Sequence, residues 1–201
     1  MTREAIDVLV FDLMDTVIVD PFYELVPRAL GMTLEELFAV KDPTAWLEFE
    51  AGEIDEAGYF ARCFTAEHAD RLPSPRLVKD AAVQGSRLVA GMAPLLAELH
   101  GGPCALWALS NYSCWFEPIR ARLGLDRFFD GYVISYQIGC RKPDPRAYRA
   151  LCARASVQPA RCLVIDDRET NVAGAQAVGM HALRFHDAPT LRADLATLGL
   201  L

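Results

Sequence analysis

Short apolar runs recur along the chain, and helix-like segments of about a dozen residues lie between the later runs. The five runs are Val8–Phe11, Cys104–Leu109, Tyr132–Ile134, Cys162–Ile165 and His181–Phe185. Runs of this kind are typical of strands buried on both faces, and their alternation with helices is typical of a parallel sheet covered by helices. The pattern therefore predicts an α/β fold with a doubly wound parallel sheet.

Capping residues mark several helix boundaries in the second half of the chain. Asp144 is a good N-cap and Pro145 suits the first helical position, so this pair predicts a helix from 145 to about 155. Gly124, Gly179 and Gly199 suit the left-handed residue that ends a helix. These glycines predict helices over residues 113–123, 171–178 and 190–198.

Residues 20–90 break this rhythm, because they contain no clear strand and show one helix-like segment after another. Thr33 and Glu36 have the spacing of a capping box, and Gly31 separates two of the segments. The expected helices cover residues 21–30, 33–40, 43–51, 55–69 and 75–89. The sequence thus predicts a core made of residues 1–19 and 91–201, with a helical domain of residues 20–90 inserted after the first strand.

The composition excludes several classes of protein. With 201 residues, 52% of them hydrophobic and 23% charged, the chain can bury its own core and is not disordered. No stretch approaches the ~20 apolar residues of a membrane span, and the first residues are unlike an export signal. We therefore expect a cytoplasmic protein without a membrane partner. A net charge of −7, most of it in residues 20–90, disfavours a nucleic-acid partner. The sequence does not indicate an oligomeric state.

Polar side chains follow the apolar runs, where parallel sheets bind their ligands. The residues at these predicted strand ends are Asp12, Ser110, Asn111, Lys142, Asp166 and Asp167. Arg141 and Lys142 follow the third run after a short loop. Three carboxylates that converge with one or two such cations repel each other in a dry pocket unless protons or a hard divalent cation compensate them. Mg²⁺ prefers oxygen ligands and commonly works beside a phosphate. We therefore expect Mg²⁺ as the cofactor.

Four segments carry a resemblance to a known family. They are VLVFDLMDTVI, ALSN, CRKPDP and LVIDDRETNVAGAQAVGM. In this order and spacing, over nearly the whole chain, they resemble the four motifs of the haloacid dehalogenase superfamily of hydrolases. The resemblance implies a Rossmann-like core. It also implies that the helical insert is a cap domain, a lid that covers the site in many members.

The resemblance implies roles for five of these strand-end residues. Asp12 matches the nucleophile, which forms a phospho-aspartate in this family, a form of covalent catalysis by a carboxylate. Ser110 and Lys142 match the residues that bind the transferring phosphoryl group. Asp167 matches the acidic metal ligand, with Asp166 in support. These roles suit phosphoryl transfer, which needs positioning and charge neutralisation above all.

One position departs from the family pattern. The family usually has a second aspartate two residues after the nucleophile, as general acid for the leaving group and then as base for water. This sequence has Met14 there, followed by Asp15. The family also uses the backbone carbonyl at this position as a metal ligand, which Met14 can supply. Side chains three apart in an extended segment do not share a face, so Asp15 can act as the acid only if the chain turns locally. The candidate proton donors are Asp15 and an ordered water.

A narrower resemblance concerns the substrate. The segments MDTVIVDPFYELVP and PTAWLEFEAGEIDE are similar to a branch that includes the plastid flavin mononucleotide hydrolases of plants, with the same Met-Asp-Thr version of the first motif. The resemblance implies phosphatase activity without the second aspartate and makes flavin mononucleotide a candidate substrate. Aromatic residues of the insert either fill its helical bundle or stack on a flat ligand. Within the insert, Tyr23 and Trp46 are the candidate substrate contacts. Asn111, outside the insert, is a third candidate.

Three functions are open to a chain with these motifs. The first is a Mg²⁺-dependent phosphomonoester hydrolase that acts on a small metabolite through phospho-Asp12. The second is a 2-haloacid dehalogenase, in which Asp12 attacks carbon without a metal. Dehalogenases also lack the second aspartate, but a site for halocarboxylates has no use for Asp166 and Asp167. The third is a catalytically degenerate member retained for binding, which Met14 favours and the intact set of motif residues disfavours.

Overall fold

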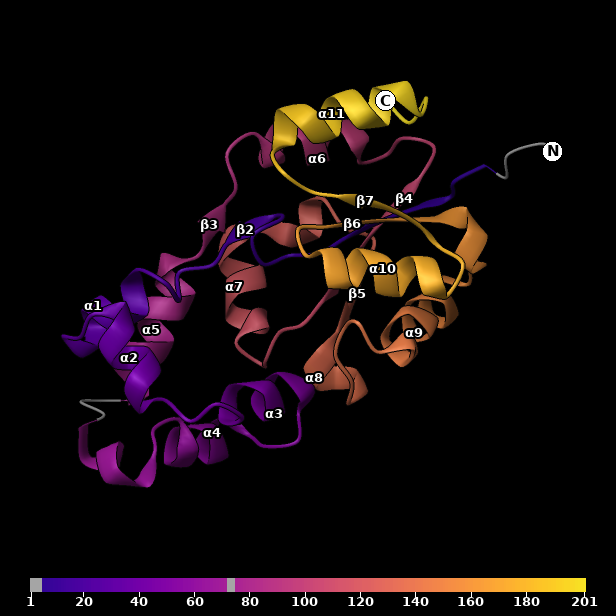
Figure 1. Cartoon of the computed structure of the whole chain (residues 1–201). Coiled ribbons are helices and arrows are strands. Elements are labelled where there is room, and N and C mark those ends of the chain that lie inside the picture. The colour runs from indigo at the N-terminus through magenta and orange to yellow at the C-terminus, as the bar shows by residue number, and fades with distance from the viewer. Residues whose placement is uncertain (1–4, 72–74) are drawn as a thin grey trace.

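The computed structural model describes residues 5–71 and 75–201, and it contains the five-stranded parallel sheet that the apolar runs predict. The strands are β1 (Val8–Phe11), β4 (Ala105–Ser110), β5 (Gly131–Ile134), β6 (Cys162–Asp166) and β7 (His181–Arg184). They lie in the order β5-β4-β1-β6-β7, and each neighbouring pair is parallel (Figure 1). The chain builds outward from β1 in both directions, so β1 and its neighbours form the switch point at which such sheets bind ligands.

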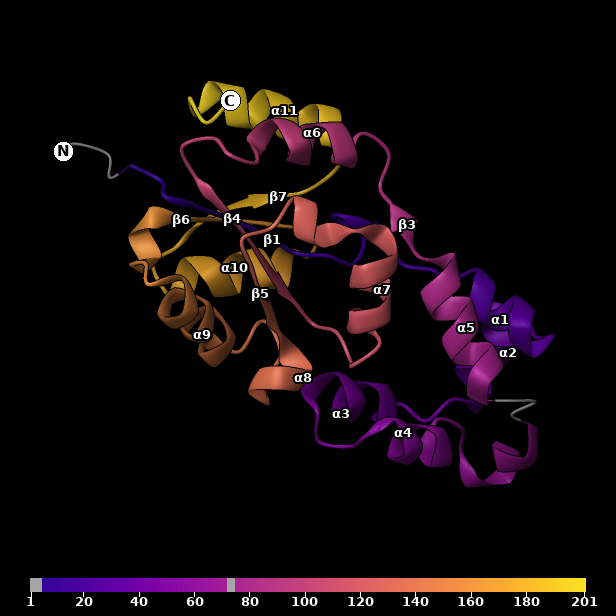
Figure 2. The same cartoon turned by 180° about the vertical axis from the view of Figure 1, so that it is seen from behind.

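Helices cover both faces of the sheet (Figures 1 and 2). They are α6 (Met92–Leu99), α7 (Phe116–Leu123), α9 (Pro145–Ala155), α10 (Glu169–Ala177) and α11 (Ala188–Thr197). Leu9 and Phe11 of β1 pack in one core cluster with α6, α7 and α11. Val8 and Val10 pack in a second cluster with α9 and α10. Because successive side chains of a strand point to opposite faces, β1 is buried on both sides, and the doubly wound architecture is confirmed.

Short elements complete the second half of the chain. They are the helix α8 (Ser135–Ile138) and the 3₁₀ turns η2 (Leu125–Arg127) and η3 (Pro159–Arg161). The predicted cap of α9 is confirmed, since the Asp144 carboxylate accepts the Arg146 N–H at 2.8 Å. The prediction that α7 begins at 113 was wrong, because Cys114 and Trp115 form a turn before the helix begins at Phe116. Among the described helices, none has the length and apolar character needed to cross a bilayer.

Between β2 (Ile18–Val19) and β3 (Arg87–Leu88) the described chain is largely helical. The elements are α1 (Leu25–Leu30), α2 (Leu34–Val40), α3 (Ala45–Ala51), α4 (Glu56–Arg62), the 3₁₀ helix η1 (Ala66–Arg71) and α5 (Pro75–Gly85). The helices α1 to α5 form a group beyond one edge of the sheet (Figure 1). They contact the rest of the chain where α3 packs on α8 and α5 packs on α7.

Two details of this helical segment differ from the sequence-based expectation. Helix α5 ends at Gly85 and not at residue 89 as expected. The reason is that Arg87 and Leu88 of β3 pair with β2 in an antiparallel arrangement. The helix expected over residues 55–69 is divided into α4 and η1. Residues 63–65 bond instead to the end of α2, through Asp42 N–H to the Cys63 carbonyl at 2.9 Å and Thr65 N–H to the Val40 carbonyl at 2.8 Å.

Candidate active site

Predicted strand-end residues meet at the carboxyl edge of the sheet. Asp12 follows β1, and its N–H donates to the Ile165 carbonyl of β6 at 2.9 Å. Ser110 ends β4, and its hydroxyl donates to Oδ1 of Asp12 at 2.9 Å. Asp166 ends β6. The exposed fractions of these three residues are 5%, 1% and 0%, so the switch point of the sheet holds a buried polar site.

Lys142 joins this site from the loop between α8 and α9. Its ammonium lies 2.9 Å from Oδ1 of Asp12 and 2.5 Å from Oδ2 of Asp166. Asn111 fixes the loop, because its amide donates to the Lys142 carbonyl at 2.9 Å and accepts the Lys142 N–H at 2.7 Å. Both polar atoms of Asn111 thus bind the lysine backbone, and its contact with substrate stays a prediction. Asp12, Ser110, Lys142, Asp166 and Asp167 are called the strand-end group below.

Burial disfavours the charged forms of these carboxylates. It raises the pKa of Asp12 to about 6; Lys142 opposes this shift, and the carboxylates of Asp166 and Asp167 add to it. Burial by itself lowers the pKa of Lys142, but Asp12 and Asp166 outweigh it and hold this pKa above its ordinary value. Burial and Asp166 also raise the pKa of Asp167. Arg168 opposes the shift at Asp167, but this arginine is exposed, so one buried lysine faces three acids and the site favours a further cation.

The three acids are placed to hold a divalent cation. One carboxylate oxygen from each of Asp12, Asp166 and Asp167 lies within 4.8 Å of the other two. Oδ1 of Asp167 is buried and has no hydrogen-bond partner among the described residues. The Asp166 carboxylate, in contrast, accepts hydrogen bonds from Lys142 and Asn171. A buried carboxylate oxygen without a donor, next to two other acids, fits Mg²⁺, which takes oxygen ligands.

The turn after β1 places Met14 and Asp15 in different surroundings. Met14 is half-buried and bridges to Ile18. Asp15 is exposed, and its φ of 55° lies in the left-handed region that non-glycine residues seldom occupy. Its Oδ1 accepts the Asp20 N–H at 3.0 Å. The chain therefore turns locally at Asp15, and this carboxylate binds the backbone of Asp20. The proton-donor role of Asp15 stays a prediction.

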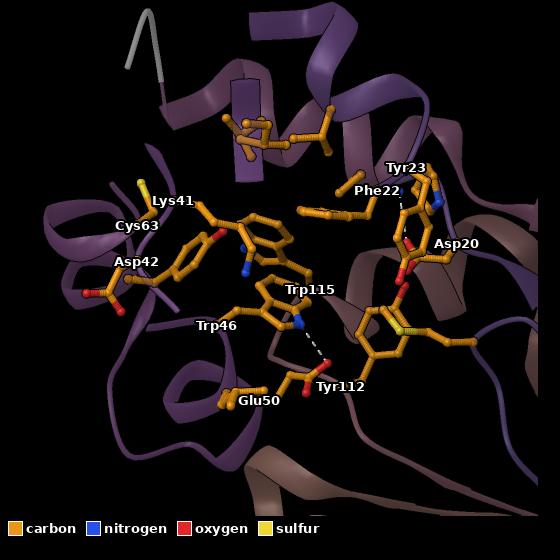
Figure 3. A pocket seen from close by; sticks show the side chains of 18 of the residues that line it. Asp20, Phe22, Tyr23, Lys41, Asp42, Trp46, Glu50, Cys63, Tyr112 and Trp115 are labelled. Carbon is orange, nitrogen blue, oxygen red and sulfur yellow. Dashed lines mark hydrogen bonds between the residues drawn. The ribbon is translucent and has the colours of Figure 1, made fainter. Parts of the chain in front are cut away.

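A cavity of about 220 Å³ lies between this edge of the sheet and the helices α1 to α5 (Figure 3). Aromatic rings form much of its wall. The Trp46 ring lies 5.6 Å from Trp115 and 5.5 Å from Tyr59, centroid to centroid. Tyr23 and Phe38 also line the cavity, and they are 52% and 48% exposed. The two aromatic residues predicted as substrate contacts, Tyr23 and Trp46, thus share one cavity.

A buried ion pair forms part of the cavity wall. Glu50 of α3 accepts the Trp46 indole N–H at 2.8 Å and the Arg141 Nε–H at 2.8 Å, and Nη2 of Arg141 lies 2.6 Å from the same Glu50 oxygen that accepts Nε–H. Burial raises the pKa of Glu50 to about 7, although Arg141 opposes this shift. The Glu50 carbonyl also accepts the Ser135 hydroxyl of α8. Helix α3 is therefore tied to the loop that carries Lys142, the residue after Arg141.

Four short segments contribute one residue to the strand-end group and another to the cavity wall. The wall residues are Met14, Tyr112, Arg141 and Arg168, and the matching strand-end residues are Asp12, Ser110, Lys142 and Asp167. Five residues of the cavity wall were not predicted from the sequence, namely Asp20, Glu50, Tyr112, Trp115 and Arg168. Their closeness to motif residues could have indicated Tyr112 and Arg168. Nothing local indicates Asp20 or Glu50, since the helices bring both of them to the cavity.

Comparison with known proteins agrees with this fold. Residues 6–179 match the family described as haloacid dehalogenase-like hydrolase. The chain therefore belongs to the haloacid dehalogenase-like hydrolases, as the four motifs predict. The strand-end group occupies the edge of the sheet at which a member of a doubly wound fold is expected to act.

Relatives by sequence include phosphatases. Flavin mononucleotide hydrolase 1 of Arabidopsis thaliana is 36% identical over 198 residues, which are 98% of this chain and 80% of that protein. The sesquiterpene phosphatase astK of Aspergillus oryzae is 28% identical over 160 residues, 78% of this chain and 80% of that protein. The similarity to the first relative agrees with the narrower resemblance found in the sequence.

Solved structures share the fold at low sequence identity. A family enzyme of Bacteroides thetaiotaomicron, in complex with magnesium and inorganic phosphate, has a TM-score of 0.77 at 20% identity and covers 91% of this chain and 96% of its own. The L-2-haloacid dehalogenase of Xanthobacter autotrophicus, with chloropropionic acid covalently bound, has a TM-score of 0.69 at 21% identity and covers 98% and 84%. An enzyme that binds magnesium and phosphate and a dehalogenase therefore share this fold, and the site must indicate the function.

Proposed function

We propose that the chain is a Mg²⁺-dependent phosphomonoester hydrolase that works through phospho-Asp12. The observation that carries the proposal is the buried Asp167 oxygen without a donor, in a group with two more acids and one lysine. Extra carboxylates repel a halocarboxylate unless a metal compensates them, and a dehalogenase needs no metal. The same carboxylates suit a phosphatase, because a bound cation and Lys142 together draw in an anionic ester.

Asp12 is the proposed nucleophile. Its pKa of about 6 leaves the carboxylate mostly ionised at neutral pH. As one of its oxygens bonds to phosphorus, the bond to the leaving oxygen breaks, and this oxygen keeps the electron pair. Water then attacks the phosphorus of phospho-Asp12, so that inorganic phosphate leaves and the carboxylate is restored. The Ser110 hydroxyl and the Lys142 ammonium both reach Oδ1 of Asp12 at 2.9 Å, so they are placed to bind the non-bridging phosphoryl oxygens.

Mg²⁺ is the proposed cofactor, with Asp12, Asp166, Asp167 and the Met14 carbonyl as its protein ligands. When bound, Mg²⁺ supplies positive charge that compensates the negative charge of these acids and of the ester. We expect MgCl₂ to stabilise the fold, by about 2.7 kcal/mol at one hundred times the dissociation constant, as seen in thermal unfolding. Asp167→Asn should remove most of this stabilisation. Glu169→Gln, an exposed neighbour, should keep it. Equal stabilisation of both variants would contradict the assignment of Asp167.

The helices of residues 20–90 are the proposed cap, and the cavity beneath them is the proposed leaving-group site. Its volume of about 220 Å³ is below the roughly 300–1,000 Å³ of typical small-molecule sites, so it suits one ring system rather than a whole nucleotide. Its aromatic walls suit a flat ring, with Trp46 and Tyr23 as contacts. Flavin mononucleotide is the candidate substrate, because its ring is flat and the relative named for it is similar over nearly the whole chain.

The test is a panel of substrates assayed with and without Mg²⁺. It contains flavin mononucleotide, fructose 1-phosphate, p-nitrophenyl phosphate and 2-chloropropionic acid. We expect metal-dependent phosphate release from the esters, with the highest kcat/KM for flavin mononucleotide, and no halide release. Halide release without metal would support the dehalogenase instead. An absence of both activities would support a degenerate member. A preference for fructose 1-phosphate would contradict the proposed substrate but leave the phosphatase in place.

A further inference from the structure

The cavity contains a carboxyl group that the steps above do not use. Asp20 follows β2 directly, is half-buried and lines the cavity together with Met14. Met14 stands where the family usually has its acid, so the leaving-group side of the site lacks a proton donor at that position. Figure 3 shows Asp20 beside Tyr23 and close to Tyr112, at one end of the cavity. Asp15, in contrast, is exposed and does not line the cavity.

Among the described residues, three carboxyl groups line the cavity, and they differ in how many donors they bind. Oδ1 of Asp42 accepts backbone N–H groups at the start of α3, which hold its pKa below the ordinary value. The Glu50 carboxylate accepts the indole and guanidinium bonds described above. Oδ1 of Asp20 accepts one bond, from the Phe22 N–H at 2.9 Å. Its Oδ2 accepts none within the described part of the chain, so one oxygen is available to a substrate.

The groups around Asp20 bring its pKa closer to neutral pH, as acid and base catalysis by one carboxyl group requires. Burial raises the pKa of Asp20 to about 6, and the Asp15 carboxylate adds to this shift. The Phe22 N–H and the Arg168 guanidinium oppose it. Tyr112 faces Asp20 from the core, and burial raises the pKa of its hydroxyl, so it stays neutral. An acid of this strength can both give and recover a proton near neutral pH.

We propose that Asp20 is the general acid and base of this site, an inference that rests on the phosphatase function proposed above. As the bond between Asp12 and phosphorus forms, the bond to the leaving oxygen breaks, and this oxygen takes its proton from Asp20. Water then bonds to phosphorus, the bond from phosphorus to Asp12 breaks, and Asp20 takes a proton from the water. Asp15 is a positioning residue, because its Oδ1 holds the Asp20 N–H at 3.0 Å.

The test is a series of substituted phenyl phosphates, which have nearly the same size but leaving groups of different basicity. The measured quantity is kcat/KM, which reports the transfer to Asp12 and not the later hydrolysis of phospho-Asp12. Asp20→Asn should lower kcat/KM for phenyl phosphate by about 10²-fold or more, and for p-nitrophenyl phosphate by less than about 10-fold. The plot of kcat/KM against leaving-group basicity therefore becomes steeper. Asp20→Asn should also give a burst of p-nitrophenolate, because the base for the second step is gone.

Two further variants make this test specific. Asp80→Asn, on the exposed side of α5, should keep the wild-type slope. Asp15→Asn should change the slope less than Asp20→Asn does. The assignment of Asp20 is overturned if Asp20→Asn lowers kcat/KM by the same factor for every ester in the series. It is also overturned if the plot of kcat/KM against leaving-group basicity is steeper for Asp15→Asn than for Asp20→Asn. The proposed function fails separately, if the wild-type protein releases no p-nitrophenolate in the presence of Mg²⁺.

Discussion

Asp12→Asn is expected to lower the kcat of ester hydrolysis by roughly 10³-fold or more, as the loss of a covalent nucleophile does in other enzymes. An amide oxygen attacks phosphorus far more weakly than a carboxylate oxygen. The fold should persist, because asparagine keeps the shape of the side chain and can accept the Ser110 hydroxyl that Asp12 accepts at 2.9 Å. Lys142 also keeps its ion pair with Asp166. Phosphate release at saturating ester and Mg²⁺ gives kcat, and thermal unfolding reports the fold.

The matched control for this variant is Asp7→Asn. Asp7 lies just before β1, and its carboxylate pairs with Arg161 at 2.5 Å in a half-exposed position away from the strand-end group. This variant should keep the wild-type kcat, because a pair of this kind contributes only about 0–1 kcal/mol to stability and does not reach the site. Wild-type phosphate release by Asp12→Asn would place the nucleophile on another residue.

Lys142→Met is expected to reduce both stability and activity. The Lys142 side chain is 1% exposed and lies between Asp12 and Asp166. Methionine fills a similar volume without charge, so it leaves two buried carboxylates without their cation. Breaking a buried ion pair in this way typically costs about 3–5 kcal/mol of unfolding free energy. Loss of the charged group that we propose binds the phosphoryl oxygens should lower kcat by about 10²- to 10³-fold. Urea unfolding without metal measures the first effect, and phosphate release the second.

Lys79→Met is the control for charge removal elsewhere. Lys79 pairs with Glu56 at 2.7 Å, and the two side chains are 36% and 34% exposed. Solvent screens such a pair, so its loss should change the unfolding free energy by no more than about 1 kcal/mol. MgCl₂ should restore part of the stability of Lys142→Met, because a divalent cation compensates the same carboxylates. If the two variants unfold at the same urea concentration, the lysine does not hold the acids together.

The sheet was predictable because parallel strands buried on both faces appear in the sequence as continuous apolar runs. The run Val8–Phe11 is an example, since alternate residues of β1 enter the two separate core clusters. The start of α9 was predictable for another local reason, because Asp144 and Pro145 satisfy a helix N-terminus by themselves. Polar residues directly after such runs, Asp12 and Ser110 among them, were expected to converge, since the ends of parallel strands share one edge.

The sequence could not show features that depend on distant contacts. β2 and β3 contain two residues each, too few for a periodic pattern, and each forms because the other lies beside it. Residues 63–65 leave the helical pattern because the end of α2 offers them bonding partners. Asp20 and Glu50 reach the cavity for the same reason. Neither has a motif around it, and only the packing of the helices on the core brings them near the strand-end group.

Four short segments each carry one residue of the strand-end group and one residue of the cavity wall. This arrangement affects how the enzyme can acquire new substrates. A substitution at Arg141 or Tyr112 changes a segment that also carries Lys142 or Ser110, which we propose as catalytic residues. Selection for a different leaving group at these positions therefore risks the reaction rate. Phe38 lies on α2, away from these segments, so exchanges there can reshape the cavity while the strand-end group keeps its spacing. Trp46 differs, because its indole bonds Glu50, which pairs with Arg141. We expect divergence in substrate preference to accumulate on α2 first.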